Sequence, residues 1–246
     1  MTATLVLYRA SGAPVSTVFQ RKGLGDSDPF APWREIAWEG IGAMSAGRLR
    51  FEGSLEIASF PHVETLVVVE GELTLETAGA APLVLQPGSG VVIGADTALR
   101  VATSSSALVM FCAAACPQAA QTGGVFPLHA KANFKPSANS LPKEILLGPV
   151  PQCRSDNVFN EESIKYLAGT WDSTPYHRIV RAHPVNEFMH LLAGGVRFAE
   201  PDGSVVSVAA GDAVFVPQGA AIGWESSERV AKFYVVQTVP AAIEGK

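Results

Sequence analysis

Short stretches of the chain consist either of consecutive β-branched and apolar residues or of alternating apolar and polar residues. Thr65–Val69 is a run of the first kind, and Glu72–Glu76 alternates. Both patterns predict β-strands, because successive side chains of a strand point to opposite faces of a sheet. The other predicted strands are Val91–Ile93, Ala107–Cys112, Phe188–Leu192, Ala213–Val216 and Val230–Gln237.

Turn-forming residues separate these strands. Gln86-Pro87-Gly88 is one such cluster, and Pro201-Asp202-Gly203 lies between two alternating runs, which predicts a hairpin. Asn160–Leu167 is the one stretch that also allows a short helix, since an Asn that can cap it is followed by glutamates. Regularly spaced short strands without long helical patterns predict a β-sandwich or a barrel.

The same arrangement of strands and turns occurs twice. The matching pairs are Glu64 and Glu187, Gly71 and Gly194, Gly88 and Gly211, and Phe111 and Tyr234. Each pair is separated by 123 residues, half of the chain, which predicts a duplicated domain. We place the N-terminal copy in residues 1–120 and the C-terminal copy in 121–246. The second half of the connection 113–154 is expected to supply the first strands of the second copy, as Leu5–Gln20 would for the first.

Composition limits the class of protein. The chain has 246 residues, of which 48% are hydrophobic and 17% charged, so it can bury a large core. A net charge of -5 argues against a nucleic-acid partner. No uninterrupted apolar run reaches the ~18 residues that a membrane helix needs. The start has no basic region of a signal peptide, and three cysteines are too few for a disulfide framework, so we expect a cytoplasmic protein.

The glycine and proline spacing in the second copy resembles that of a known family. Glu187 is followed by Gly194, and Gly211-DAVFV-Pro217-Gln218-Gly219 comes next. This Glu-x6-Gly and Gly-x5-Pro-x-Gly pattern resembles the two cupin motifs, and residues 169–237 resemble (S)-ureidoglycine aminohydrolase and the ethanolamine-utilisation-type cupins. The first copy matches the same frame more weakly, with Gly94 and Asp96 at the places of Pro and Gly. The resemblance implies an all-β fold of two tandem cupin (double-stranded β-helix, jelly-roll) barrels in one chain.

The same resemblance implies where a metal would bind. Metal-binding cupins use His-x-His-x3-Glu and a later His, and these positions are Arg181, His183, Glu187 and Ile222 in this chain. Only His183 and Glu187 are competent ligands, for Mn, Fe, Ni or Zn, and catalytic zinc sites keep three protein ligands. His177 would reach the site only across a bend. In the first copy Ala58 and Phe60 occupy the ligand positions.

The candidate ligand-binding residues of the second copy are Arg181, His183, Glu187, Trp224 and Lys232. Glu187 is expected to pair with Arg181, forming a fixed dipole for a carboxylate or amide ligand. Trp171 and Trp224 either stack on a planar ligand or pack in the core. Glu64 has no basic residue at the matching places, so we expect it at the rim or hydrogen-bonded within its strand. No catalytic residue is assigned.

Three classes of function follow. The first is binding of a small nitrogenous or carboxylate metabolite in the C-terminal barrel, in a protein related to ureidoglycine aminohydrolase. The second is a metal-dependent hydrolase, isomerase or dioxygenase that uses His183 and Glu187. The third is a structural or regulatory bicupin without catalysis. Because jelly-roll barrels have edge strands that must be covered, and the duplication itself can cover them, both a monomer and a homodimer are compatible with the sequence.

Overall fold

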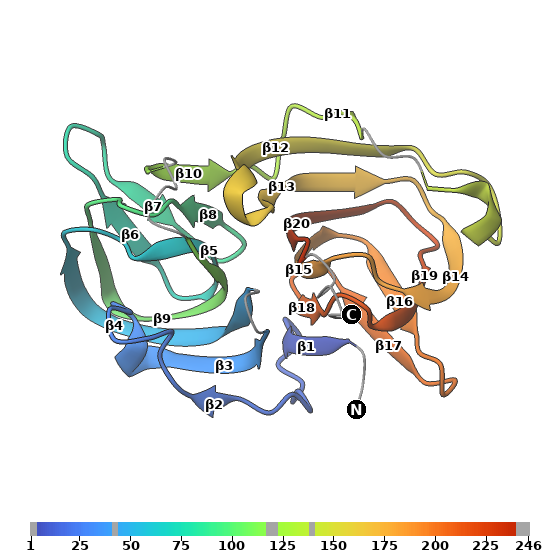
Figure 1. Ribbon diagram of the computed structural model, residues 1–246, viewed down its shortest axis with the longest axis horizontal. Helices are drawn as coiled ribbons and strands as arrows, with labels where there is room; N and C mark the ends of the chain where they lie inside the picture. The colour runs from blue at the N-terminus through green and yellow to red at the C-terminus, as the bar shows by residue number, and fades with distance from the viewer. Residues whose placement is uncertain (1–3, 41–43, 117–122, 138–140, 240–246) are drawn as a thin grey trace, which may run out of the picture.

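Two β-barrels lie side by side in the computed structural model, which describes residues 4–40, 44–116, 123–137 and 141–239 (Figure 1). Within these ranges the chain forms strands and three short 3-10 turns, and no α-helix. Accordingly, this part of the chain contains no helix of the length and hydropathy needed to cross a membrane. The predicted all-β architecture of two tandem barrels is confirmed.

The N-terminal barrel is built on one sheet of nine strands. Seven of them follow one path, in the spatial order β10 (Val125–Leu128), β8 (Gly90–Ile93), β5 (His62–Glu70), β9 (Leu99–Ala115), β4 (Ser45–Ile57), β3 (Arg34–Glu39) and β2 (Gln20–Arg21). Two further strands, β6 (Leu73–Glu76) and β7 (Leu83–Leu85), join this path through the pairing of β6 with β9. The 3-10 turn η1 (Ala31–Trp33) directly precedes β3.

The C-terminal barrel is built on two sheets. The larger one has the order β1 (Leu5–Tyr8), β18 (Ala213–Val216), β15 (Asn186–Ala193), β20 (Val230–Gln237), β13 (Tyr166–Ser173), β12 (Cys153–Glu161) and β11 (Lys135–Pro136). The smaller one has the order β14 (His177–Ala182), β19 (Ala221–Glu225), β16 (Gly195–Ala199) and β17 (Val205–Ala209). The 3-10 turn η2 (Lys143–Ile145) precedes β12.

The two barrels exchange one strand each. β1 pairs with β18 of the C-terminal barrel, with Leu5 opposite Phe215, and β10 pairs with β8 of the N-terminal barrel, with Phe126 opposite Val92. Each half therefore lends its first strand to the other. The expectation that Leu5–Gln20 begins the first barrel is wrong for β1, because the sheet edge that its backbone completes belongs to the second barrel. The sequence boundary at residue 120 stays a prediction.

Local turn chemistry explains two connections. The hairpin predicted at Pro201-Asp202-Gly203 joins β16 to β17, and Gly203 has a φ of 85° there. The stretch that allowed a short helix forms only the 3-10 turn η3 (Glu162–Ile164), in which the N–H of Ser163 donates a hydrogen bond to the side chain of Glu161. The residues on both sides of this turn pair in the strands of the sheet, so a helix of greater length does not form.

Buried hydrophobic residues form a core inside each barrel and a third one between them. The shared core joins Val67 and Met110 of the first barrel to Phe215 and Phe233 of the second. β5 is buried along nearly its whole length because one face lines its barrel and the other meets this shared core. Across the same interface the hydroxyl of Tyr166 lies 2.8 Å from Thr65 Oγ1 and 3.0 Å from the carbonyl of Cys112.

Candidate functional site

Glu187 lies on β15, inside the C-terminal barrel. Its Oε2 lies 2.9 Å from His183 Nε2, and its Oε1 accepts a hydrogen bond of 2.8 Å from Lys232 Nζ. Burial would raise the pKa of Glu187, but the Lys232 ammonium and the contact with His183 hold it well below its usual value. The expected pairing of Glu187 with Arg181 is therefore wrong: Lys232 and His183 occupy its two oxygens.

Lys232 is buried on β20 among aromatic rings. Its Nζ lies 4.6 Å from the ring centre of Trp171 and 5.0 Å from that of Trp224, and it contacts Met189 Sδ at 3.1 Å. Tyr176 stacks on Trp224 with ring centres 5.3 Å apart. Trp224 therefore already packs against Tyr176 and a lysine, and it supports the ammonium group by a cation–π contact.

Two arginines of β14 face the same interior. Arg181 lies opposite Ile222 and Arg178 opposite Trp224, and directly opposed residues of paired strands share one face. Ile222 and Trp224 belong to the buried core of this barrel, so both arginines start from its inner face. Arg178 is buried and Arg181 half-buried. Burial lowers the pKa of Arg178, yet a guanidinium keeps its proton in proteins.

His183 follows β14 and is held by a turn of the backbone. Its N–H donates to the carbonyl of Ala220, and its carbonyl accepts from the N–H of Gly219. With Nε2 placed on Glu187, the second ring nitrogen, Nδ1, is buried and has no hydrogen-bond partner. A buried polar atom without a partner is costly, and here it lies in a ring whose other nitrogen is already oriented by a carboxylate.

The interior of the C-terminal barrel is therefore positively charged. Three cations, Arg178, Arg181 and Lys232, share this interior with Glu187: Lys232 binds its carboxylate, and the charge of Glu187 also acts on Arg178. Sequence reasoning found Arg181 and Lys232 but missed Arg178. Its register opposite Trp224 was not visible because β14 shifts its pairing between Arg178 and Arg181.

The arrangement does not fit the divalent metal that cupin barrels commonly hold. His183 and Glu187 contact each other, and the Lys232 ammonium lies 2.8 Å from the carboxylate that would have to bind the ion. Among the described residues no group of three or more His, Cys, Asp or Glu side chains is placed to hold a metal. His177 does not add a ligand here, because it is exposed at the start of β14.

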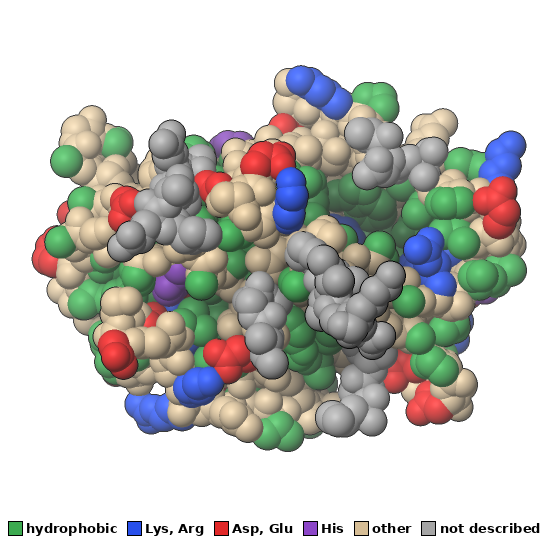
Figure 2. All heavy atoms as spheres, viewed as in Figure 1, with side chains coloured by type: hydrophobic (Ala, Val, Ile, Leu, Met, Phe, Trp, Pro, Cys, Tyr) green, Lys and Arg blue, Asp and Glu red, His purple; other side chains and the backbone are tan. Residues whose placement is uncertain are grey.

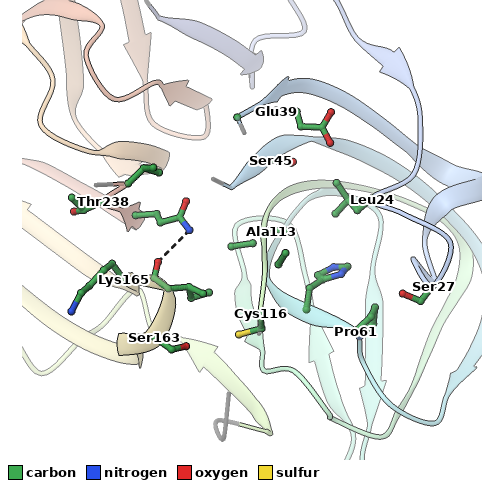
Figure 3. Close-up of a pocket in the computed structure, with 17 residues that line it drawn as sticks. Leu24, Ser27, Glu39, Ser45, Pro61, Ala113, Cys116, Ser163, Lys165 and Thr238 are labelled. Carbon is green, nitrogen blue, oxygen red and sulfur yellow. Dashed lines mark hydrogen bonds between the residues drawn. The ribbon is translucent and has the colours of Figure 1, made fainter. Parts of the chain in front are cut away.

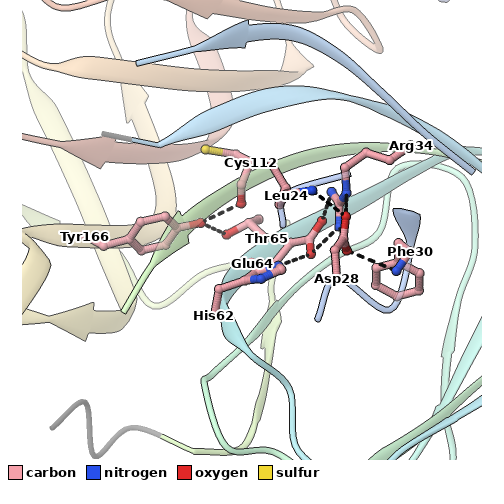
Figure 4. Close-up of polar contacts among 9 residues, drawn as sticks. All are labelled: Leu24, Asp28, Phe30, Arg34, His62, Glu64, Thr65, Cys112 and Tyr166. Atoms are coloured by element: carbon pink, nitrogen blue, oxygen red, sulfur yellow. Dashed lines mark hydrogen bonds and ion pairs between the residues drawn. The ribbon is translucent and has the colours of Figure 1, made fainter. Parts of the chain in front are cut away.

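The N-terminal barrel holds a second carboxylate of the same kind (Figure 4). Glu64 on β5 bonds Arg34 through both oxygens, at 2.7 and 3.0 Å, and its Oε2 lies 2.8 Å from His62 Nε2. Asp28 receives two further hydrogen bonds from Arg34. Burial opposes ionisation of Glu64, but the Arg34 charge and His62 keep its pKa low. Glu64 is thus fully buried and paired: of its two expected places the rim is wrong, and the hydrogen bond within its own strand is confirmed by His62, which also lies on β5.

In both copies of the repeat, the equivalent glutamate therefore contacts a histidine Nε2 and a cation. The histidine and the cation come from different positions in the two copies. The histidine precedes Glu64 by two residues and Glu187 by four. The cation comes from β3 in one barrel and from β20 in the other. This explains why comparison of matching positions found no basic partner for Glu64.

A cavity of about 880 Å³ opens between the two barrels (Figure 3). Its wall includes Pro61, His62 and Cys116 of the first barrel and Ser163 and Lys165 of the second. None of the five candidate residues of the C-terminal barrel lines it.

His190 is buried on β15 and stacks on Phe233. Burial lowers its pKa to about 4, although the nearby Asp212 acts in the opposite direction.

On the face of the molecule shown in Figure 2, acidic and basic side chains are mixed, and neither kind of charge forms a patch over a barrel.

Comparison with known proteins gives the family. EutQ-like cupin domains match residues 161–234. A crystal structure of a protein of unknown function from Pseudomonas syringae pv. tomato, described as a DUF861 family member, is 36% identical. The alignment covers 96% of this chain and 100% of that one, with a TM-score of 0.91. This chain belongs to the DUF861 family of cupins.

More distant structures share the fold of this DUF861 cupin. Protein Ylba from E. coli, also of the DUF861 family, is 9% identical over 94% of this chain and 97% of its own, with a TM-score of 0.54. A Cupin 2 conserved barrel domain protein from Leptotrichia buccalis is 9% identical over 81% and 86%, with a TM-score of 0.55. No curated protein matches the cupin.

Proposed function

We propose that the C-terminal barrel binds a small nitrogenous metabolite that carries a carboxylate, such as a ureido or amino acid derivative, without a divalent metal. The observation that carries this proposal is the charge of the barrel interior, where Arg178, Arg181 and Lys232 share the inner face with the carboxylate of Glu187. An anionic ligand would offset the excess positive charge. The attraction between opposite charges is strong in a partly desolvated site.

The side chains suggest how such a ligand would lie. Its carboxylate would accept hydrogen bonds from Arg181, which is half-buried and therefore reachable, with the buried Arg178 behind it. Its N–H group would donate to His183 Nδ1, which has no partner in the described structure. Trp224 and Glu187 would act through Lys232, because both contact its ammonium group.

The resemblance to (S)-ureidoglycine aminohydrolase supports the ligand class, since ureido compounds carry N–H donors beside a carboxylate. The departure lies in the metal positions. Arg181 and Ile222 replace two ligands, and a guanidinium repels a divalent ion while it attracts a carboxylate. Arg181, which weakens a metal site, therefore strengthens an anion site.

A matched ligand panel tests this proposal. Isothermal calorimetry with N-carbamoylglycine, N-acetylglycine and the uncharged N-methylurea should give binding for the two acids and at least about tenfold weaker binding for the urea, about 1.4 kcal/mol. Arg181→Met should remove the preference for acids. Arg197→Met, which breaks an exposed pair with Glu225, is the control and should keep it. An equal response of wild type and Arg181→Met would refute the assignment.

The same panel tests the metal-dependent alternative that uses His183 and Glu187. Treatment with a chelator, followed by Mn, Fe, Ni or Zn, should change neither the acid affinity nor the melting temperature. A metal-dependent rise of either quantity would show that an ion binds despite Lys232 and would overturn the metal-free proposal.

A second candidate function, metal-free hydrolysis, is favoured by the contact between His183 and Glu187. A carboxylate on Nε2 orients the ring so that Nδ1 can accept a proton from water, as a general base does. Incubation with N-carbamoylglycine and assay of released ammonia tests it. Turnover that falls at least about a hundredfold in His183→Gln, with acid binding retained, would support catalysis, and no turnover in wild type would leave binding alone.

A further inference from the structure

The cavity between the barrels has the size of a small-molecule site. Its volume of about 880 Å³ lies in the range of about 300–1,000 Å³ that is typical of ligand pockets. Apolar side chains of Leu24, Ile164 and Val239 share its wall with the hydroxyl groups of Ser27 and Ser45. The wall thus offers both apolar surface and polar groups, as ligand sites do.

His62 gives this cavity a directed polar group. The residue is buried and lines the cavity, and its Nε2 lies 2.8 Å from Glu64 Oε2 (Figure 4). A carboxylate accepts hydrogen bonds, so it selects the ring form with a proton on Nε2. The ring atom of His62 that remains for a molecule in the cavity is then Nδ1, which accepts a hydrogen bond when the ring is neutral.

The charges behind His62 leave one negative charge uncompensated. Asp28 and Glu64 are both ionised, because Arg34 lowers the pKa of each of them against the effect of burial. Arg34 supplies the single positive charge, and its side chain and both carboxylates are fully buried. Two carboxylates and one guanidinium leave an excess of one negative charge next to the imidazole.

The charged residues at the rim do not cancel this excess. Glu39 is paired with Lys22 at 2.6 Å, and Lys165 with Glu162 at 3.1 Å. Their own charges are opposite, so together they add nothing to the cavity. The thiol of Cys116 stays protonated at neutral pH, because burial and then the nearby carboxylates raise its pKa to about 11.

We propose that the cavity between the barrels is a second binding site, separate from the C-terminal barrel, and that it takes a small organic amine whose N–H group donates to His62 Nδ1. The ammonium charge offsets the negative charge behind the ring, and the alkyl part covers the apolar wall. The two barrels then have opposite preferences, an anion in the C-terminal one and a cation at the N-terminal one.

Ligand-observed NMR and calorimetry with butylamine and with butyrate test the charge preference. Butylamine should bind at least about tenfold more tightly than butyrate to the full-length protein. His62→Gln keeps an N–H donor for Glu64 but lacks the second ring nitrogen, and it should weaken butylamine binding by a similar factor. His129→Gln changes an exposed histidine outside the cavity and should leave it unchanged.

Two further measurements place the ligand. Ala115→Leu fills the cavity from an exposed position at its wall and should abolish butylamine binding without unfolding the protein. In a spectrum of ¹⁵N-histidine-labelled protein, butylamine should shift the Nδ1 resonance that disappears in His62→Gln. Equal binding of amine and acid, or an amine affinity that both variants leave intact, would overturn the proposal. His183→Gln separates the sites, since it should not alter amine binding.

Discussion

At the scale of single residues, partners distant in sequence decide what each charged group does. Glu64 and Glu187 occupy equivalent places in the repeat, yet one is bound by Arg34 and the other by Lys232. The side chain of Glu64 is fully buried, whereas 11% of that of Glu187 is exposed. The small opening at Glu187 makes the C-terminal barrel the better candidate for an anion site.

The buried His190 predicts an acid-sensitive component of stability. Its pKa of about 4 in the folded chain lies below the ~6.5 of an unfolded histidine. The unfolded chain therefore binds the proton first, and stability falls as the pH decreases from about 6.5 to 4, by about 3 kcal/mol.

Urea unfolding of wild type and His190→Gln over this pH range measures the effect. The variant should show a smaller decrease, and His177→Gln, at an exposed site, should behave like wild type. Parallel pH profiles of wild type and His190→Gln would contradict the assignment.

At the scale of elements, glycines determine where the strands can pack closely. Gly71 and Gly194 have φ angles of 75° and 71°. A Cβ on either would overlap a backbone carbonyl of the neighbouring chain segment, of Ser106 or of Arg229. The two halves thus repeat the same close approach after the same strand, for a reason that backbone geometry explains.

Two glycine substitutions separate dihedral strain from overlap. Gly203→Ala, with a φ of 85° and open space around it, should cost about 1 kcal/mol of stability. Gly194→Ala adds the overlap with Arg229 and should cost at least about 3 kcal/mol. Chemical denaturation of both variants measures the difference, and equal losses would show that the overlap relaxes without cost.

At the scale of the whole molecule, the exchange of β1 and β10 joins the barrels. Each strand completes a sheet of the other half, and a common hydrophobic core lies between them. The hydrogen bonds of the Tyr166 hydroxyl with Thr65 and with the carbonyl of Cys112 cross the same interface. Neither half contains all the strands of its own barrel, so we expect the two barrels to unfold together.

Fragments 1–120 and 121–246 test this coupling. Each alone should lack a cooperative unfolding transition, because β18 or β8 loses its edge partner, whereas the two refolded together should form a 1:1 complex. Size-exclusion chromatography and circular dichroism detect it. Leu7→Asp, in the part of β1 that enters the shared core, should prevent assembly, and Val18→Asp, at an exposed site, should not. A fragment that folds alone would contradict the coupling.

The sequence by itself determined seven of the strands, the duplication, the cupin fold and the presence of Arg181, His183, Glu187 and Lys232 in one barrel. These depend on local alternation, on turn residues and on a fixed spacing, all of which lie within short stretches of chain. Only the tertiary structure decided that Lys232 rather than Arg181 pairs with Glu187, that Arg34 pairs with both Glu64 and Asp28, and that β1 and β10 change barrels. Such choices depend on which strands become neighbours, because electrostatic pairing and edge pairing act over a few ångströms of space between residues far apart in sequence.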